Sequence, residues 1–325
     1  MKFVRREFLR IAAGAAVLPA LCRIASAQAY PSRPVRIIVT TAPGGGPDIV
    51  ARLIGQWLSE RLGQQFLIDN RPGASGSIGT EAVVKAAPNG YTLLMVGASS
   101  AINATLQSKL NFNFIRDIAP VASISRTAAV LVVHPSVPAP TVPDLIAHTK
   151  TNPGKLTFGS PGIGSSPHMA GELLKMMAGI NLLHVPYRGD AAALTDLIGG
   201  QVQLSFVGAP AATEYIRTGK VRSLAVTSAT RLQTVPDIPT VGEFVAGYEA
   251  NGWAGFGAPR DTPAEIVAKL NREINAALAD PKIIARLADL GSTPAAGSPA
   301  DFGKLIAEET EKWAHVITFA GIKAE

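Results

Sequence analysis

Short apolar runs alternate with segments of helical spacing from residue 35 onwards. β-branched and aliphatic runs bounded by glycine and proline predict strands at 35–40, 66–69, 91–96, 156–159, 182–185, 204–207 and 223–227. Apolar residues at helical spacing predict helices around 49–58, up to 87, and at 168–177, 191–198, 263–279 and 299–319. A strand, a loop, a helix and a strand in succession are typical of βαβ units, so we expect an α/β fold with mostly parallel sheets.

Glycine-rich loops follow five of the predicted strands. They lie at 42–48, 71–79, 97–100, 159–166 and 186–190. A helix N-terminus offers unpaired N–H groups and a positive dipole end, and glycine lets a ligand approach the backbone closely. Ligands of open α/β sheets bind outside the carboxyl ends of the strands, so the five loops together predict an anion site. Each loop alone is equally explained as a tight turn.

Polar side chains stand at two of the predicted helix starts. We expect Asp48 to cap the first helix, and Ser165 or Ser166 to cap the helix after the 159–166 loop. The hydroxyl group of either serine is equally suited to a ligand carboxylate.

The first 27 residues have the pattern of an export signal. Arg5 and Arg6 form a twin pair, an apolar stretch follows at 11–21, and the small residues at 25–27 suit cleavage before Gln28. We interpret this as a twin-arginine signal for export to the periplasm, with a Sec signal or a membrane anchor as alternatives. The apolar stretch is too short for an anchor, and Leu21 before the single cysteine, Cys22, disfavours lipid attachment.

Charge and composition exclude further classes. The chain has 30 Lys+Arg and 24 Asp+Glu, of which the signal holds five and one, so 25 and 23 remain. This small excess gives no support to a nucleic-acid partner. Removing 27 of 325 residues leaves 298, enough for two domains of about 150 residues. No later apolar stretch reaches the length of a membrane helix.

The motifs of common cofactor and catalytic sites are missing. The sequence has no GxxxxGK[ST], and Ile49 stands where GxGxxG needs its third glycine. The five histidines have no HxxH or HExxH spacing, and no GxSxG occurs at a strand-to-helix turn. His168 follows Ser165 and Ser166 closely, but sequence proximity does not make a catalytic pair. We therefore expect no cofactor, no metal and no enzymatic activity.

Seven stretches, in order and spacing, resemble one known family. They are Pro34–Val39, Pro43–Asp48, Asp69–Gly76, Pro88–Leu93, Gly159–His168, Pro186–Gly189 and Asp196–Val202. On these stretches the chain resembles the Bug family, the solute receptors of tripartite tricarboxylate transporters. The resemblance covers the chain after the signal.

The resemblance implies a periplasmic binding protein of the type II-like fold, with a ligand cleft between two lobes. The first lobe would comprise 28–128 plus 252–325, and the second 129–251. A small ligand carboxylate would be held by loop amides, hydroxyl groups and bridging water, the lobes would close around it, and a membrane permease would receive it. The family uses no cofactor, and we expect a monomer.

The same resemblance transfers a set of ligand-binding residues onto this chain. In the first lobe these are Pro43, Gly44, Gly45, Gly46, Pro47, Asp48, Gly73, Ala74, Ser75, Gly76, Ser99 and Ser100. In the second lobe they are Ser160, Gly162, Gly164, Ser165, Ser166, His168, Tyr187, Arg188, Gly189 and Asp190.

Two positions depart from the family pattern. Pro47 replaces the expected threonine or serine, which removes a hydroxyl group and a backbone donor. Asp190 and Ala191 stand where small residues, often glycine, are usual. Asp190 either caps a helix, receives an ammonium or hydroxyl group of the ligand, or repels a second ligand carboxylate. We hypothesise a preference for a monocarboxylate or an amino-bearing acid over a tricarboxylate.

Two other functions fit the sequence less well. A receptor that feeds a sensor instead of a permease has the same sequence features, and gene neighbours would separate the two. An enzyme acting on a small organic acid would need a convergent base and nucleophile, which the sequence does not show.

Overall fold

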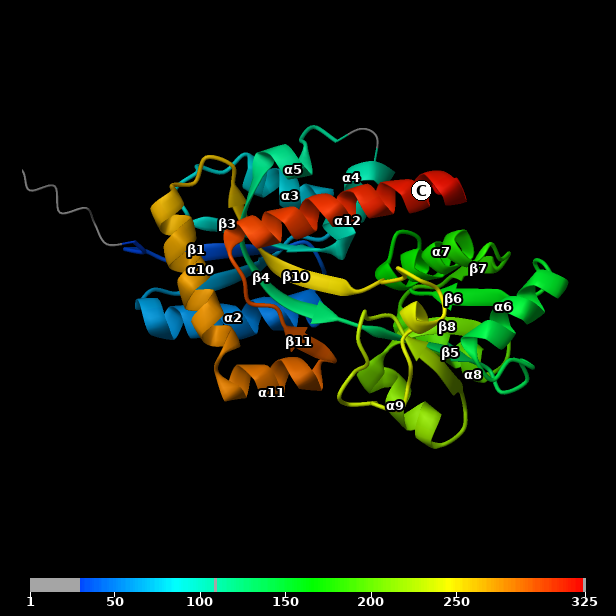
Figure 1. Cartoon of the computed structure of the whole chain (residues 1–325). Coiled ribbons are helices and arrows are strands. Elements are labelled where there is room, and N and C mark those ends of the chain that lie inside the picture. The colour runs from blue at the N-terminus through cyan, green and yellow to red at the C-terminus, as the bar shows by residue number, and fades with distance from the viewer. Residues whose placement is uncertain (1–29, 108–109, 324–325) are drawn as a thin grey trace, which may run out of the picture.

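A computed structural model of the chain describes residues 30–107 and 110–323, so the predicted export signal, including Cys22, lies outside the described residues. Two α/β lobes lie side by side, each a sheet with helices on both faces (Figure 1). The predicted fold class is confirmed, although both sheets are mixed where parallel pairing was expected throughout most of each.

The first sheet has six strands in the order β11-β4-β10-β3-β1-β2. β1 pairs in parallel with β2 and with β3, as the βαβ pattern predicts. β10 is antiparallel to β3 and to β4, and β11 is antiparallel to β4. The strands are β1 (Val35–Val39), β2 (Phe66–Asn70), β3 (Thr92–Gly97), β4 (Ile118–Thr127), β10 (Gly252–Pro259) and β11 (Ser292–Pro294).

The second sheet has five strands in the order β7-β6-β8-β5-β9. β6 is parallel to β7 and β8, whereas β5 is antiparallel to β8 and β9. The two sheets therefore share one arrangement. The series β2-β1-β3-β10-β4 in the first sheet corresponds to β7-β6-β8-β5-β9 in the second, and the fourth strand of each series, β10 or β5, runs opposite to the others. The strands are β5 (Ala129–Val133), β6 (Thr157–Ser160), β7 (Leu183–Pro186), β8 (Leu204–Gly208) and β9 (Arg222–Val226).

Helices cover both faces of the sheets. They are α2 (Gly46–Leu62), α3 (Ser77–Val84), α4 (Ala98–Leu106), α5 (Phe114–Asp117), α6 (Val142–Thr151), α7 (Ser166–Ala178), α8 (Asp190–Ile198), α9 (Ala209–Arg217), α10 (Ala264–Leu278), α11 (Pro281–Asp289) and α12 (Pro299–Ala320), with short 3-10 turns at Ala74–Gly76 and Val241–Glu243. Among the described residues, no helix is both long and apolar enough to cross a membrane.

Two segments connect the lobes. β4 ends at Thr127 and β5 begins at Ala129, while the chain returns to the first sheet through β10 (Figure 1). β3 runs in the direction of β4 because both are antiparallel to β10, so the carboxyl ends of β1, β2 and β3 face the second lobe. Ala129 pairs with Gly208, the last residue of β8, so the carboxyl ends of β6, β7 and β8 face the first lobe. The loops after these strands therefore face each other.

The C-terminal helix joins the two halves of the core. α12 packs against α4 in the first lobe and α7 in the second. One apolar cluster runs through all three and includes Ile102, Leu173, Phe206 and Trp313. A second cluster lies under α2 and α10 in the first lobe, and a third under α8 and α9 in the second.

One predicted loop is wrong. Residues 97–100 do not form a glycine loop, because β3 ends at Gly97 and α4 begins directly at Ala98. The helix starts without a linker because the Gly97 N–H donates to Ser100 Oγ at 3.4 Å, which turns the chain within one residue.

Candidate functional site

The loop between β1 and α2 presents glycine backbone to the other lobe. Pro43, Gly44, Gly46 and Pro47 are exposed, and Gly44 has a φ of +84° that favours glycine. Gly45 is the N-cap of α2, so the prediction that Asp48 caps this helix is wrong in detail. Pro47 has no N–H, so Gly46 and Asp48 supply the amide donors of the first helical turn.

The buried carboxylate of Asp48 holds this loop through hydrogen bonds. Its side chain is 2% exposed and accepts hydrogen bonds from the Gly44 N–H (2.9 Å), from Arg52 Nε and Nη2 (both 3.0 Å) and from Asn70 Nδ2 (2.9 Å). Burial alone would raise the pKa of Asp48, but the hydrogen bonds from Arg52, Gly44 and Asn70 hold that pKa at about 2. The carboxylate is thus ionised and occupied by the protein, which makes it a support for the loop.

The turn after β2 has an unusual backbone. Gly73, Ala74, Ser75 and Gly76 all have positive φ, and the values of 45° and 52° at Ala74 and Ser75 are uncommon for residues with a side chain. Two side-chain amides, one in α4 and one at its C-cap, hold the turn: Asn103 donates to the Ser75 carbonyl at 2.6 Å and Gln107 to the Ala74 carbonyl at 3.0 Å. Strained backbone held by its surroundings is common at functional sites.

A small pocket lies between this turn and the start of α4. Ser75, Gly76, Ser99 and Ser100 line it together with Asn103. Ser99 is exposed at the first turn of α4, where the N–H groups have no intrahelical acceptor. Four of the predicted first-lobe residues therefore meet at one place.

The second lobe presents the loop between β6 and α7. Gly162 and Gly164 have φ values of +140° and +73°. Ser165 is the N-cap of α7, as predicted: its Oγ accepts from the His168 N–H at 3.3 Å and donates to the Gly162 carbonyl at 2.6 Å. Ser166 begins the helix, and its neighbour Pro167 has no N–H, so the amide and hydroxyl groups of Ser166 stand at the helix start.

Two histidines, the buried His168 and the half-buried His184, support this loop. His168 Nδ1 accepts from the Gly164 N–H at 3.1 Å, and His184 Nε2 shares a 2.6 Å hydrogen bond with Ser160 Oγ. The rings stack with 3.8 Å between centroids. Burial lowers the pKa of His168 to about 3, with further contributions from His184 and Lys175, and burial with Lys175 lowers that of His184 to about 4. Both rings are neutral at pH 7, and Ser160, which is fully buried, takes part in the same support.

The loop between β7 and α8 completes the second-lobe set. The Tyr187 hydroxyl donates to Asp196 Oδ2 at 2.8 Å, and burial together with Asp196 raises the pKa of Tyr187 to about 12. Arg188 and Asp190 are exposed. The N-cap of α8 is Gly189, without a side-chain cap, so the interpretation of Asp190 as a helix cap is wrong. Asp190 occupies the first helical position, where its charge suits the helix dipole.

The predicted residues thus form two groups. The first group lies at loops or helix starts on the facing edges of the sheets and comprises Pro43 to Pro47, Gly73 to Gly76, Ser99, Ser100, Gly162, Ser165, Ser166 and Tyr187 to Asp190. Asp48, Ser160, Gly164 and His168 are buried and support those loops.

Sequence reasoning missed the partners that shape the loops. Arg52, Asn70, Asn103, Gln107 and His184 were not predicted, because their roles depend on contacts between distant segments. A signal existed for one missed strand-to-helix junction: Gly208 ends β8 and Ala209 begins α9, as Gly97 ends β3 and Ala98 begins α4.

Apart from the exposed, positively charged Arg188, the facing loops supply neutral hydrogen-bond donors. First-turn amides lie at the facing edges of the sheets where α2, α4, α7 and α8 begin. The hydroxyl groups of Ser99 and Ser166 lie at two of these helix starts. Such donors bind anions at helix N-termini without a metal or a cofactor. The part of the chain that the structure describes contains no group of three or more His, Cys, Asp or Glu placed to hold a metal ion.

The chain matches one protein family over most of its length. The family model described as "Tripartite tricarboxylate transporter family receptor" matches residues 50–322. The curated protein BugT of Bordetella pertussis is 36% identical over 92% of this chain and 92% of its own length.

Solved structures agree with this match. Rpa4515 of R. palustris, solved with adipate, is 38% identical with a TM-score of 0.77, covering 90% of this chain and 99% of that chain. The periplasmic binding protein BugD is 33% identical with a TM-score of 0.74, covering 91% and 100%. MatC from Rhodopseudomonas palustris with bound malate is 31% identical with a TM-score of 0.73, covering 89% and 100%.

Proposed function

This chain belongs to the family of tripartite tricarboxylate transporter receptors, and from that premise we propose that it is a periplasmic receptor for a small carboxylate. The ligand would lie between the lobes, with one carboxylate held by amide and hydroxyl donors of the facing loops. The observation that carries the proposal is the position of four helix N-termini, from both lobes, at the facing carboxyl edges of the two sheets. Adipate and malate in the two related structures support the ligand class.

We further propose lobe boundaries at the two crossings, with 28–128 plus 252–325 in one lobe and 129–251 in the other. The strand membership of the two sheets supports this division. Closure would then occur by rotation about the segments near Ala128 and Asn251. We expect export through the signal at residues 1–27 and delivery of the ligand to a tripartite permease, and delivery to a sensor is the alternative.

Asp190 bears on the choice of ligand. Its carboxylate is exposed at the start of α8 and does not cap that helix. We propose that it disfavours a second or third carboxylate near this helix start by like-charge repulsion. Citrate should therefore bind more weakly than monoacids or amino acids, and Asp190→Asn should reduce the difference. Tight citrate binding to the unmodified protein would contradict this.

A thermal-shift screen tests the proposed function. The panel contains monocarboxylates, malate, adipate, citrate, amino acids and aromatic acids. A ligand at 100 times its Kd should stabilise the fold by about 2.7 kcal/mol. Product analysis after incubation separates a receptor from an enzyme, since a receptor returns the ligand unchanged.

Two serine variants make the screen site-specific. Ser99→Ala and Ser166→Ala each remove one hydroxyl donor, one from each lobe, and each should weaken binding by about fivefold. Ser136→Ala, outside the loops, is the control. Hits among uncharged compounds only, or hits that neither loop variant weakens, would overturn the proposal.

A further inference from the structure

A hollow lies on the other side of the crossing strands from the facing loops. In the first sheet, β11 flanks β4 on one side, while β3, β1 and β2 lie beyond β10 on the other. In the second sheet, β9 flanks β5 on one side, and β8, β6 and β7 lie on the other. Figure 1 shows α11 and β11 of the first lobe next to α9 of the second, below the crossing strands. Both lobes therefore border the crossing strands on two sides: the side of the facing loops and the side of this hollow.

We name this hollow the hinge pocket. It has a volume of about 850 Å³ and is lined by α11 and β11 from the first lobe and by α9 and residues 228–234 from the second. Arg126, Ala128 and Asn251 of the crossing segments line it as well. Any rotation of one lobe against the other must change its volume, because its walls belong to different lobes.

The lobes already touch at the rim of the hinge pocket. Gly291, with φ +68°, lies so close to Pro210 that a Cβ on the glycine would be 2.5 Å from Pro210 Cδ. On the loop side, Gly164 lies against α4, where a Cβ would be 3.0 Å from Leu106 Cδ2. The angle between the lobes is thus limited by contacts on both sides of the crossing strands.

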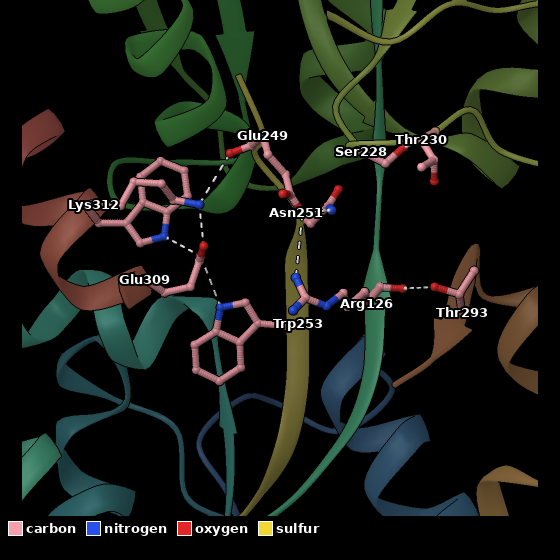
Figure 2. A network of polar contacts seen from close by, with 10 residues as sticks. Arg126, Ser228, Thr230, Glu249, Asn251, Trp253, Thr293, Glu309 and Lys312 are labelled. Carbon is pink, nitrogen blue, oxygen red and sulfur yellow. Dashed lines mark hydrogen bonds and ion pairs between the residues drawn. The ribbon is translucent and has the colours of Figure 1, made fainter. Parts of the chain in front are cut away.

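Residues that line the hinge pocket are tied to the C-terminal helix (Figure 2). Lys312 donates to the Glu249 carbonyl at 3.3 Å, and Glu309, which is 8% exposed, accepts from the indole N–H groups of Trp253 (3.2 Å) and Trp313 (2.9 Å). Glu249 Oε1 in turn accepts from Asn251 Nδ2 at 2.8 Å and lies 3.6 Å from Arg126 Nη1. These contacts hold the returning segment to α12, so the crossing point moves little while the lobes rotate about it.

We propose that the residues lining the hinge pocket determine ligand affinity without touching the ligand. Rotation that brings the facing loops together widens the hinge pocket, and rotation that separates the loops narrows it. A larger side chain in the pocket resists narrowing, disfavours the open form and tightens binding. A smaller side chain has the opposite effect. The predicted effect on ligand affinity rests on the proposed function, whereas the predicted effect on the angle between the lobes does not.

Three substitutions in α11 test the inference. Ala288 and Ile284 line the pocket, whereas Ala285 is exposed on the same helix and does not line it. Ala288→Leu should tighten carboxylate binding by about fivefold and Ile284→Ala should weaken it by a similar factor. Ala285→Leu makes the same chemical change as the first variant and should leave the Kd unchanged. Titration calorimetry with the tightest acid of the panel measures all three.

A distance measurement provides a readout that needs no ligand. Spin labels at Arg286→Cys in α11 and Arg217→Cys in α9, both exposed, span the hinge pocket in the full chain carrying Cys22→Ser. Ala288→Leu should lengthen the distance between the labels and Ile284→Ala should shorten it. Equal distances in the Ala288→Leu and Ala285→Leu proteins would overturn the inference. A shift in distance with no carboxylate binding in any variant would retain the coupling of the pocket to the lobe angle and refute the proposed function.

Discussion

The facing glycine loops of the two lobes have similar backbone but are supported by opposite chemistry. In the first lobe an ionised carboxylate, Asp48, collects hydrogen bonds from the loop, from its own helix and from β2. In the second lobe two neutral imidazoles, His168 and His184, accept or share the bonds. Both supports hydrogen-bond groups of the loop itself, and the proposed function assigns the helix start that follows to the ligand. The difference teaches that similar glycine loops can be held by a charged or an uncharged support, and the two should respond differently to acid.

The largest expected effect is that of pH on the free energy of unfolding, because acid should weaken the histidine support before the Asp48 support. The folded-state pKa values of His168 and His184, about 3 and about 4, lie below the ordinary value of 6.5. The unfolded chain therefore binds more protons below pH 6.5, and stability falls as the pH drops through this window. From pH 7.5 to 4.5 we expect the two histidines to lower the free energy of unfolding by about 3–5 kcal/mol, measured by urea denaturation, while the raised pKa of the buried Glu172 acts in the opposite direction.

The first-lobe support should not contribute in that range. Asp48 has a folded pKa of about 2, below its ordinary value of 3.8, so its stabilisation is complete above pH 3.8 and is lost only as the pH falls towards 2. His184→Gln should reduce the loss between pH 7.5 and 4.5 by about half, whereas His148→Gln in α6 should leave it unchanged. A free energy of unfolding that stays constant down to pH 4.5 would refute the neutral-histidine account.

Removing the charged support should have the next largest effect. Asp48→Ala leaves the Gly44 N–H and the Asn70 amide without their acceptor and Arg52 without its ion-pair partner. We expect a loss of about 3 kcal/mol in the free energy of unfolding and weaker ligand binding. Chemical denaturation of this variant beside Asp237→Ala, an exposed aspartate, measures the difference. Equal stability of the two variants would mean that Asp48 supports nothing.

A substitution at Tyr187 tests whether its hydroxyl group supports the second lobe or contacts the ligand. Its hydroxyl group donates to Asp196, so Tyr187→Phe should cost about 1.5 kcal/mol in the free energy of unfolding. Ligand affinity should change by less than about threefold, because the hydroxyl group is already engaged within the second lobe. A tenfold weaker Kd in calorimetry would show instead that this hydroxyl group turns to the ligand.

The smallest expected effect concerns the left-handed turn of the first lobe. Ala74 has φ 45°, a conformation that glycine adopts without strain. Ala74→Gly should therefore raise the free energy of unfolding by about 0.5–1 kcal/mol. Ala246→Gly, at an exposed alanine outside the positive-φ residues, should lower it through the entropy of the unfolded chain. Thermal denaturation of both variants would contradict the strain argument if both lost stability.

Much of the fold was accessible from the sequence because its parallel strands are strongly patterned. The runs at β1, β6 and β8 are β-branched or apolar and bounded by glycine, and their positions were predicted within one or two residues. The crossing strands β4 and β10 were missed because they are rich in small residues, and β5 was missed although its residues are apolar. Gly255 shows why: a Cβ there would lie 2.3 Å from the Phe302 ring and 2.5 Å from the Ala122 carbonyl. Close packing under α12 thus removes the apolar pattern that marks a strand.

The candidate site was accessible in part for a similar reason. Glycines at helix starts are local features, and they located the loops at 42–48 and 159–166. The supports are not local: Asn103 and Gln107 reach the 73–76 turn from α4 and its C-cap, and Arg52 and Asn70 reach Asp48 from different elements. Asp48 was expected as a cap and Asp190 had a cap among its three alternatives, yet glycine occupies each N-cap position. A carboxylate near a helix start does not reveal from sequence alone what it binds.

The central claim, that donors of both lobes hold a carboxylate, is tested most directly by comparing an acid with its amide. Calorimetry with the tightest acid of the panel and its primary amide changes the charge of the ligand and little of its shape. Charge-assisted hydrogen bonds are about twice as strong as neutral ones, so the acid should bind at least about 100-fold more tightly. Equal affinities for the acid and the amide would contradict the claim.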